Sequence, residues 1–372
     1  DVRPSRSWLT LGGVPARASA ASRAVEMCSL ATSVNHILTG EQRRKLFPPE
    51  VGIIAGASAT LKASDVKVSR AFHTPESGER LFYQTVAPAD REPTCVLVWF
   101  HGYTAHADMD MQSLSEVARG GALVVMPDLP GHGRSDGMLA YTPDWWKFVE
   151  AVWDFVDAVV QPLRGPSQKL FAAGHSLGGG LTACLGVQRP TYFDGLVLVA
   201  PMLYVSDEVK PHWIVQQAFR RLLGPWKLSW PIAPSKDISC FDFRVPEQGP
   251  KLGAANPLSM GGLKPRLATA EQIAFEFPEW MEARMGEVKA PLLILHGTAD
   301  KVTDPAASKR LYDLAQAEDK ALKLYEGAFH GELLGCNTGH AEAMGVEFLP
   351  EQIAQTKEAI KDIVDWIQAR AR

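Results

Sequence analysis

The sequence predicts an α/β protein built on an open, mostly parallel, doubly wound sheet with an inserted helical cap. From about residue 66 onward, short apolar runs alternate with longer stretches of helical periodicity. Continuous apolar strands of this kind are typical of a parallel sheet covered by helices on both faces. The alternation stops between Pro201 and Pro291. Because this interval is too long for a simple connection in a compact domain, we predict that it forms the cap.

The strands follow from the apolar runs in chain order. Residues 66–72 and 81–87 are separated by a turn with Pro75 and Gly78, and this pattern predicts a β-hairpin. Six later runs are each followed closely by Gly, Pro or Asp, as expected of buried strands. These runs are 95–100, 122–126, 170–173, 196–200, 292–295 and 322–325.

The intervals between the runs carry helical periodicity. In 143–163, apolar residues recur every three or four positions and form the stripe of a helix packed on a sheet. Further helices are expected after Ser176, after Asp304 and over 350–369. Within the proline-rich cap interval, the pattern predicts a helix at 213–223.

We therefore divide the chain into four parts. Residues 61–201 and 290–372 are expected to form the core, 202–289 the cap, and 1–60 an N-terminal extension. The first 40 residues carry four arginines, many serines and alanines, and only two acidic residues. This composition resembles the remnant of an organellar transit peptide. An irregular extension with few acidic residues is the alternative interpretation.

The overall composition favours a small neutral or apolar partner. The formal net charge is −4, so the chain as a whole has no cationic field to attract a nucleic acid. No apolar run approaches the roughly 18 residues of a membrane span, and any membrane contact is therefore expected to be peripheral, through the cap. The five cysteines form no CxxC pair and are expected to be reduced thiols of an intracellular protein.

Neither a metal ion nor a nucleotide cofactor is expected. The ten histidines include no HxH or HExxH spacing, and no acidic cluster has the spacing of an EF-hand. Walker and GxGxxG patterns are also absent from the sequence. The composition and motifs do not indicate an oligomeric state.

One serine has the sequence context of a nucleophile. Ser176 lies in a GxSxG pattern between a predicted strand and a predicted helix, as in a nucleophile elbow. Such a serine needs a base that a carboxylate orients. Asp300 ends the strand after the cap and His330 follows the next strand, so all three residues are expected at carboxyl ends of strands. Asp304 is the alternative carboxylate.

The same edge of the sheet offers donors for an oxyanion. Backbone N–H groups of Leu177, directly after the serine, and of Tyr103, in the loop after the first parallel strand, are the predicted pair. His101 and Gly102 are expected to shape that loop. His101 is one of four polar residues that are predicted to be structural, because they lie in turns at strand ends; the others are His132, His296 and Asp128.

Six segments together resemble a known family. They are "FHGYTAH", "PDLPGHGRSDG", "GHSLGGG", "LVLVAPM", "LILHGTADKVTDP" and "GAFHGELLG". In sequence and order they resemble the capped α/β-hydrolases of the monoacylglycerol lipase and lysophospholipase group, with the plant monoacylglycerol lipase-like and caffeoylshikimate esterase branch looking most similar. The resemblance extends from about Val66 to the C-terminus and leaves residues 1–60 outside.

The resemblance implies a serine hydrolase that cleaves an ester between one acyl chain and a small polar alcohol. Ser176 would be the nucleophile, Asp300 the acid and His330 the base, with Tyr103 and Leu177 as oxyanion donors. Monoacylglycerol is the expected substrate. A lysophospholipid, a caffeoylshikimate-type ester, transfer of the acyl group to an alcohol, and ligand binding without catalysis are the alternatives.

Three features depart from the family pattern. Ala105 replaces a glutamate that helps to bind glycerol in the animal enzymes. The residue before the nucleophile is His175, as in the animal enzymes, whereas the plant branch tends to have glutamate there. The segment 333–349 is longer than usual, and it either borders the pocket entrance or is a surface insertion.

The cap is expected to provide the apolar wall of the pocket. His175, Trp213 and Phe219 are the residues predicted to contact the substrate, with Ile214 and Leu222 or Leu223 beside them. The same cap helix combines apolar residues with Arg220 and Arg221, a mixture that also suits contact with a lipid surface.

Overall fold

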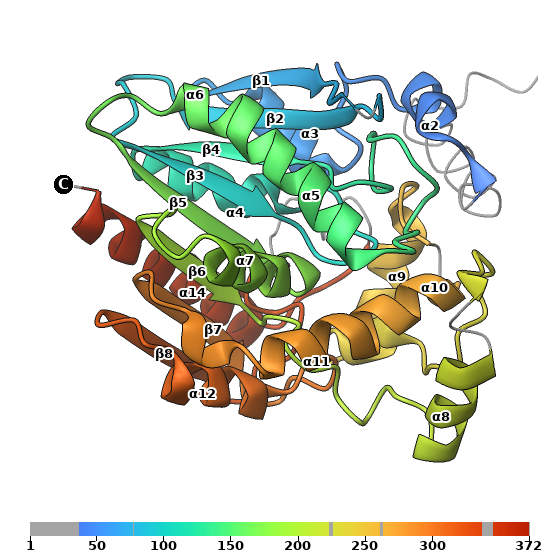
Figure 1. Ribbon diagram of the computed structural model, residues 1–372. Helices are drawn as coiled ribbons and strands as arrows, with labels where there is room; N and C mark the ends of the chain where they lie inside the picture. The colour runs from blue at the N-terminus through green and yellow to red at the C-terminus, as the bar shows by residue number, and fades with distance from the viewer. Residues whose placement is uncertain (1–36, 77, 223–225, 261–262, 337–344, 372) are drawn as a thin grey trace, which may run out of the picture.

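An eight-stranded sheet forms the centre of the molecule in the computed structural model, which describes residues 37–76, 78–222, 226–260, 263–336 and 345–371 (Figure 1). The strand order is β1-β2-β4-β3-β5-β6-β7-β8. The pairs β1–β2 and β2–β4 are antiparallel and the remaining pairs are parallel, which confirms the predicted fold class and the initial hairpin. The strands are β1 (Val66–His73), β2 (Leu81–Pro88), β3 (Cys95–Phe100), β4 (Ala122–Pro127), β5 (Lys169–His175), β6 (Gly195–Val199), β7 (Leu292–Gly297) and β8 (Lys320–Tyr325).

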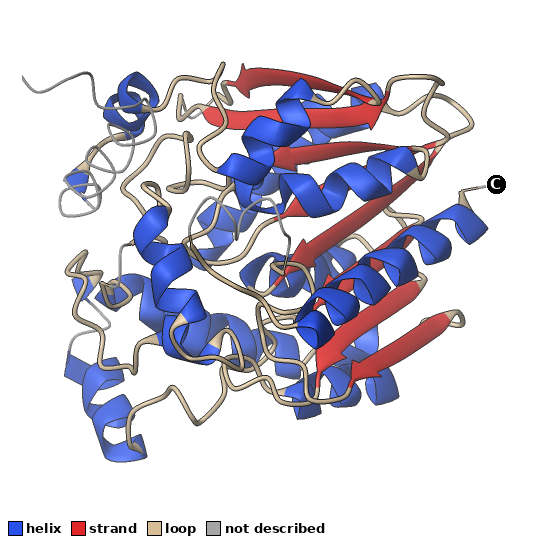
Figure 2. Ribbon diagram, turned by 180° about the vertical axis from the view of Figure 1, so that it is seen from behind, coloured by secondary structure: helices blue, strands red, loops and turns tan. Residues whose placement is uncertain are grey.

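Helices cover both faces of this sheet. Leu97 and Val98, neighbours in β3, point to opposite faces and belong to different buried clusters. Leu97 packs in the cluster that contains α3 (Ala55–Lys62), α4 (Ala107–Arg119) and α14 (Pro350–Arg370). Val98 packs in the cluster that contains α5 (Trp145–Phe155), α7 (Leu177–Gln188) and α12 (Pro305–Leu314). Figure 2, seen from behind, shows α14 in front of the strands.

The helix predicted at 143–163 is present and has a local irregularity. It consists of α5, a five-residue π-helical stretch η2 (Val156–Val160) and the short α6 (Gln161–Leu163). Asp144 begins the helix, since its carboxylate accepts hydrogen bonds from the N–H groups of Trp146 and Lys147 at 3.0 and 3.2 Å. The buried stripe of α5 then packs on the sheet as its periodicity predicts.

The predicted cap interval lies between β6 and β7 and faces the carboxyl ends of the parallel strands (Figure 1). Its last part differs from the expectation, because Phe277 and Met281 belong to the core and Phe277 lies 4.4 Å from the ring of Trp145. The interval thus closes one side of the core as well as facing the strand ends. It contains α8 (Trp213–Leu222), η4 (Ile238–Phe241), α9 (Gln248–Ala255), α10 (Leu267–Glu271), η5 (Gln272–Glu276), α11 (Phe277–Glu282) and η6 (Met285–Glu287).

The N-terminal segment corrects one expectation. Residues 40–60, predicted to belong to an N-terminal extension outside the core, contain α2 (Gly40–Leu46) and most of α3, and two buried arginines tie this segment to the core. Arg43 is fully buried and donates to the carbonyls of Gly133 and Ser135 at 2.7 and 2.6 Å. Arg134 donates to the carbonyl of Val51 at 2.7 Å. Arginine satisfies several carbonyls at once, so this segment is part of the folded core. Residues 1–36, which carry the transit-peptide-like composition, lie outside the described residues.

Candidate active site

Ser176 lies in a strained turn between β5 and α7. Its backbone has φ +56° and ψ −117°, a combination that non-glycine residues rarely adopt. The neighbouring glycines make the turn sterically possible: a Cβ at Gly178 would lie 1.9 Å from the carbonyl oxygen of Phe100, and one at Gly174 would lie 2.4 Å from the backbone of Gly178. The GxSxG pattern therefore brings strand and helix together and holds the serine at the carboxyl edge of the sheet.

Asp300 and His330 form a buried pair at the same edge. Asp300 follows β7, His330 follows β8, and His330 Nδ1 donates to Asp300 Oδ2 at 2.7 Å. The other carboxylate oxygen, Oδ1, accepts from the backbone N–H groups of Val302 and Thr303 at 2.8 and 3.0 Å. These bonds fix the orientation of the carboxylate, and the carboxylate in turn fixes the proton of His330 on Nδ1. Nε2 is left without a proton, as a general base requires.

The charges of this pair stabilise each other. Burial alone would raise the pKa of Asp300, but the neighbouring His330 and the hydrogen bonds from His296 and His330 outweigh it and lower that pKa. Burial alone would lower the pKa of His330, but Asp300, through charge and hydrogen bond, and Asp242, through charge, raise it above the ordinary imidazole value. Asp300 is therefore ionised at neutral pH and favours the imidazolium form of His330.

The raised pKa of His330 predicts the pH dependence of hydrolysis. A general base must be unprotonated, so kcat/KM is expected to fall as the pH decreases through the pKa of His330. Because that pKa lies above the ordinary value of 6.5, the midpoint of the fall is expected above pH 6.5. Initial rates on an ester that does not itself ionise, measured across the pH range, check this. A midpoint clearly below 6.5 would contradict the arrangement described here.

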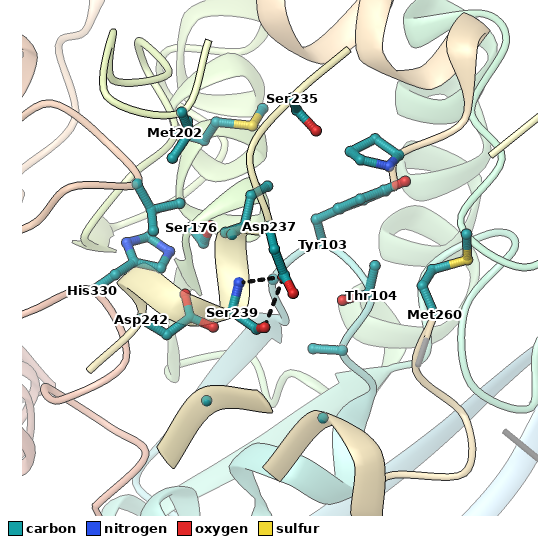
Figure 3. A pocket seen from close by; sticks show the side chains of 18 of the residues that line it. Tyr103, Thr104, Ser176, Met202, Ser235, Asp237, Ser239, Asp242, Met260 and His330 are labelled. Atoms are coloured by element: carbon teal, nitrogen blue, oxygen red, sulfur yellow. Dashed lines mark hydrogen bonds between the residues drawn. The ribbon is translucent and has the colours of Figure 1, made fainter. Parts of the chain in front are cut away.

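Ser176 and His330 line one cavity of about 390 Å³ (Figure 3). Within the described residues no hydrogen bond joins Ser176 Oγ to His330. In free enzymes such bonds are often long and shorten when substrate binds. Apolar side chains form most of the remaining wall, among them Met202, Val205, Phe219, Met260 and Ile273.

The predicted oxyanion donors lie beside the serine. A Cβ at Gly102 would lie 3.3 Å from Ser176 Cβ, so the loop that carries Tyr103 packs directly against the turn. Leu177 is the first residue of α7, and its N–H has no acceptor within the helix. His101 holds the loop, because its Nδ1 donates to the carbonyl of Gly102 at 2.8 Å and its Nε2 accepts from Leu129 N at 2.9 Å. This geometry suits a pair of backbone donors near Ser176 Oγ.

Two further predictions concern side chains near the pair. Asp304, the alternative carboxylate, is the N-cap of α12 and accepts from Ala306 N at 2.9 Å, and the structure brings Asp300 rather than Asp304 to His330. His296, expected to fix a turn, lies against Asp300 instead, with Nε2 3.1 Å from Oδ2 and Nδ1 2.7 Å from Ser308 Oγ.

The residues predicted to contact substrate separate into two groups. His175 lines the cavity, and its Nε2 donates to the backbone carbonyl of His330 at 3.1 Å, so it also positions the base. Phe219 lines the cavity and is only 6% exposed. Trp213 is a correction: it does not line the cavity and is 64% exposed. It lies on the solvent side of α8, whose inner side carries Phe219.

Two polar residues near the pair were not predicted, although both lie in segments that carry the family resemblance. Thr303 Oγ1 lies 2.9 Å from Asp300 Oδ2 and 3.2 Å from His330 Nδ1. Glu332 is fully buried, and its carboxylate accepts from Phe329 N at 3.0 Å and from Arg244 Nη2 at 2.7 Å. Glu332 thereby ties the loop of His330 to the cap interval. The signal that could have identified them is their position in the segments "LILHGTADKVTDP" and "GAFHGELLG".

The segment 333–349 is described in part. Leu333 and Leu334 are buried against the core, and Cys336 packs with Phe243 of the cap interval. Leu334 and Gly335 also line the cavity. The first residues of this segment therefore border the pocket, whereas 337–344 lie outside the described residues.

The strand order, the two antiparallel pairs at one edge and the serine turn at the end of β5 are those of the α/β-hydrolase fold, and the chain is an α/β-hydrolase. A family model described as serine aminopeptidase, S33, matches residues 91–335, and the chain belongs to this family.

Relatives of known name agree with this class. The chain is 30% identical to a caffeoylshikimate esterase of Arabidopsis thaliana, over 81% of this chain and 85% of the relative. It is 31% identical to a monoacylglycerol lipase of Mycolicibacterium smegmatis, over 68% of this chain and 86% of the relative. The crystal structure of a monoacylglycerol lipase from Paleococcus ferrophilus superposes with a TM-score of 0.58 at 25% identity, covering 82% of this chain and 99% of that one. The chain is accordingly a carboxylic ester hydrolase.

Proposed function

We propose that this chain hydrolyses monoacylglycerols through an acyl-enzyme on Ser176. One observation carries the proposal: a serine held in a strained turn faces a cavity of about 390 Å³ whose walls are mostly apolar and whose polar groups include His330 and Asp242. A cavity of this kind suits one hydrocarbon chain whose ester group lies at its polar end. Similarity to monoacylglycerol lipases supports the same substrate class.

The mechanism follows from the arrangement of the three side chains. His330 Nε2 takes the proton of Ser176 as its oxygen attacks the ester carbonyl, and the N–H groups of Tyr103 and Leu177 bind the oxyanion. The imidazolium then gives this proton to the leaving alcohol. In the second half, His330 activates a water molecule that releases the fatty acid. Asp300 stays ionised throughout and keeps His330 oriented.

The apolar wall supplies most of the binding energy. Each methylene of an acyl chain that leaves water contributes about 0.8 kcal/mol. Phe219 from α8, Met260 and Ile273 from the cap interval and Ile54 from the N-terminal segment line the cavity. The acyl chain is therefore proposed to lie between the cap interval and the core.

The substrate class is tested by comparing esters. We expect the highest kcat/KM for monoacylglycerol when it is measured beside lysophosphatidylcholine, triacylglycerol and caffeoyl shikimate. The caffeoyl ester is the second candidate, because the similarity to the caffeoylshikimate esterase covers 81% of this chain. Faster turnover of the caffeoyl ester or of the lysophospholipid than of monoacylglycerol would overturn the proposed substrate.

Peripheral contact with a lipid surface is part of the proposal. Large exposed apolar side chains are concentrated at 213–232 of the cap interval, namely Trp213, Ile214, Val215, Leu222, Trp226, Trp230 and Ile232. We call these residues the cap patch. In the part of the chain that the structure describes, no helix is both long enough and apolar enough to cross a bilayer. The cap patch lies on the same interval that lines the cavity, so it would bring the pocket to the surface where the substrate resides.

Liposome flotation tests this contact. Trp213→Ser is expected to lower the membrane partition coefficient by about tenfold or more, because a buried aromatic side chain contributes on the order of 1.5–3 kcal/mol. Leu163→Ser is the matched control, since Leu163 is exposed on α6, at the opposite end of the molecule from α8 in Figure 1. Equal recovery of wild type and Trp213→Ser with the liposomes would count against the contact.

A further inference from the structure

Asp242 is a carboxylate of the cap interval that is held beside the catalytic base. Its backbone carbonyl accepts a hydrogen bond of 2.7 Å from the N–H of Gly331, the residue after His330. Its side chain lines the same cavity as Ser176 and His330. Figure 3 shows the carboxylate of Asp242 next to His330 and turned toward the interior of the cavity. Its charge helps to raise the pKa of His330, but it takes no part in the proton transfers between Ser176, His330 and the ester.

No protein group in the described ranges donates a hydrogen bond to the Asp242 carboxylate. The contrast with Asp237 is informative, because Asp237 Oδ1 accepts from Ser239 N at 3.0 Å and from Ser239 Oγ at 2.7 Å (Figure 3). Burial raises the pKa of Asp242 to about 6, so its carboxylate is ionised at slightly alkaline pH. An ionised carboxylate in such a place is an acceptor available to a bound molecule.

The cavity lysines do not cancel this charge. Lys210 Nζ lies 3.4 Å from the ring centroid of Tyr204 and 3.6 Å from Asp207. Lys236 Nζ lies 4.0 Å from Glu208. Lys210 and Lys236 are thus directed to other partners, and Lys264, the third lysine that lines the cavity, is not among the charged groups that act on Asp242, which are His330, Asp300 and Asp237. The electrostatic potential beside His330 on this side of the cavity is therefore negative.

In the proposed mechanism the leaving alcohol lies close to this carboxylate. His330 gives its proton to the alcohol oxygen, so the alcohol must lie against the imidazole when the ester bond breaks. Asp242 is joined to the backbone of the His330 loop and faces the same space. A hydroxyl group next to the ester oxygen could donate to Asp242, whereas a phosphate in that place would meet a like charge.

We propose that Asp242 determines specificity for the alcohol part of the ester: it accepts a hydrogen bond from a free hydroxyl of a neutral polyol and disfavours an alcohol that carries a phosphate. This inference rests on the proposed function of the same site, and it adds the choice between a neutral glyceride and a lysophospholipid. Ala105, in the loop of Tyr103, offers no side-chain polar group for that purpose.

The test compares three esters of one acyl chain, namely monoacylglycerol, the ethyl ester and lysophosphatidylglycerol, at a pH well above the pKa of His330. In Asp242→Ala we expect kcat/KM for monoacylglycerol to fall about tenfold relative to the ethyl ester, which has no free hydroxyl. The ratio of kcat/KM for monoacylglycerol to that for lysophosphatidylglycerol is expected to fall by more than the ratio of monoacylglycerol to ethyl ester. Asp242→Asn keeps a hydrogen-bond acceptor but removes the charge. It is therefore expected to lose the discrimination against phosphate, whereas its kcat/KM for monoacylglycerol falls less than that of Asp242→Ala.

Glu247→Gln is the matched control. Glu247 is an exposed carboxylate in the same stretch of the cap interval and does not line the cavity, so removing its charge is expected to leave all three rates unchanged. The ethyl ester reports whether each variant is folded and active. An unchanged ratio of monoacylglycerol to ethyl ester in Asp242→Ala, or an equal fall for both esters, overturns the role of Asp242. A wild-type protein that hydrolyses none of the esters instead overturns the proposed function.

Discussion

Ser176→Ala is expected to lower kcat on any ester by about 10⁶-fold and to abolish covalent labelling by a fluorophosphonate. The substitution removes the only atom that attacks the carbonyl, while the oxyanion donors and the cavity stay in place. Ser176 Oγ makes no hydrogen bond with the described residues, so its loss leaves no buried polar group unpaired. The variant is therefore expected to unfold at nearly the same temperature as the wild type. Fluorophosphonate labelling, steady-state rates and thermal unfolding are the three measurements.

Ser235→Ala is the control for this result. Ser235 also lines the cavity, and its Oγ is buried without a hydrogen-bond partner, but Figure 3 shows it on a different side of the cavity from His330. The Ser235→Ala variant is therefore expected to be labelled at the wild-type rate, because the position of Ser176, and not the mere presence of a serine in the cavity, makes Ser176 reactive. Fluorophosphonate labelling of Ser176→Ala at the wild-type rate would refute the assignment of the nucleophile. It would also revive the alternative of a pocket that only binds its ligand.

Short-range patterns are enough to predict the fold and the position of Ser176, Asp300 and His330 at one edge of the sheet. The apolar runs mark the parallel strands, and the carboxyl ends of parallel strands meet at one edge of the sheet. Asp300 and His330 each follow such a run, so they could be assigned to that edge from the sequence, and the structure brings their side chains to 2.7 Å. The glycines around Ser176 likewise carry a local signal, because their spacing reflects the close approach of β5 and α7.

The cap helix shows where periodicity fails. The apolar side chains of 213–222 gather on one side of α8 except for Trp213, yet Ile214 and Leu222 on that side are exposed, so the pattern predicts a helix but not which residues face the cavity. Trp213 and Phe219 looked equivalent in the sequence, yet only Phe219 is buried. The difference depends on packing against Ala233 and Leu267, which are distant in the chain.

Long-range polar contacts are the other feature that the sequence does not reveal. In the sequence, nothing distinguishes Arg43 from the other basic residues near the N-terminus. In the structure, its guanidinium is buried among carbonyls of the loop that follows β4. Asp242 lies in an interval without recognisable motifs and reaches His330 only because the cap interval folds back on the core. Such contacts join segments far apart in the chain, so no spacing rule predicts them.

Asp300→Asn is expected to lower kcat by about 10⁴-fold while the site keeps its shape. Val302 N and Thr303 N both donate to Oδ1 of Asp300, so the amide oxygen of the asparagine has to take that position. Its NH₂ group then replaces Oδ2 and points at His330 Nδ1. A donor at this point requires Nδ1 to be the acceptor, which moves the proton of the neutral imidazole to Nε2. His330 can then no longer take the proton of Ser176.

Asp304→Asn separates this effect from a general loss of charge. Asp304 caps α12 through its Oδ1, and asparagine caps helices as well as aspartate does, so wild-type rates and stability are expected. In Asp300→Asn, the pKa of His330 should also fall, because the charge that raises it is gone. Steady-state rates over a range of pH measure both effects, and the residual activity should depend on pH differently from that of the wild type. If Asp300→Asn kept full activity, or if Asp304→Asn lost it, the carboxylate that orients His330 would have been assigned wrongly, whatever its distance from the ring.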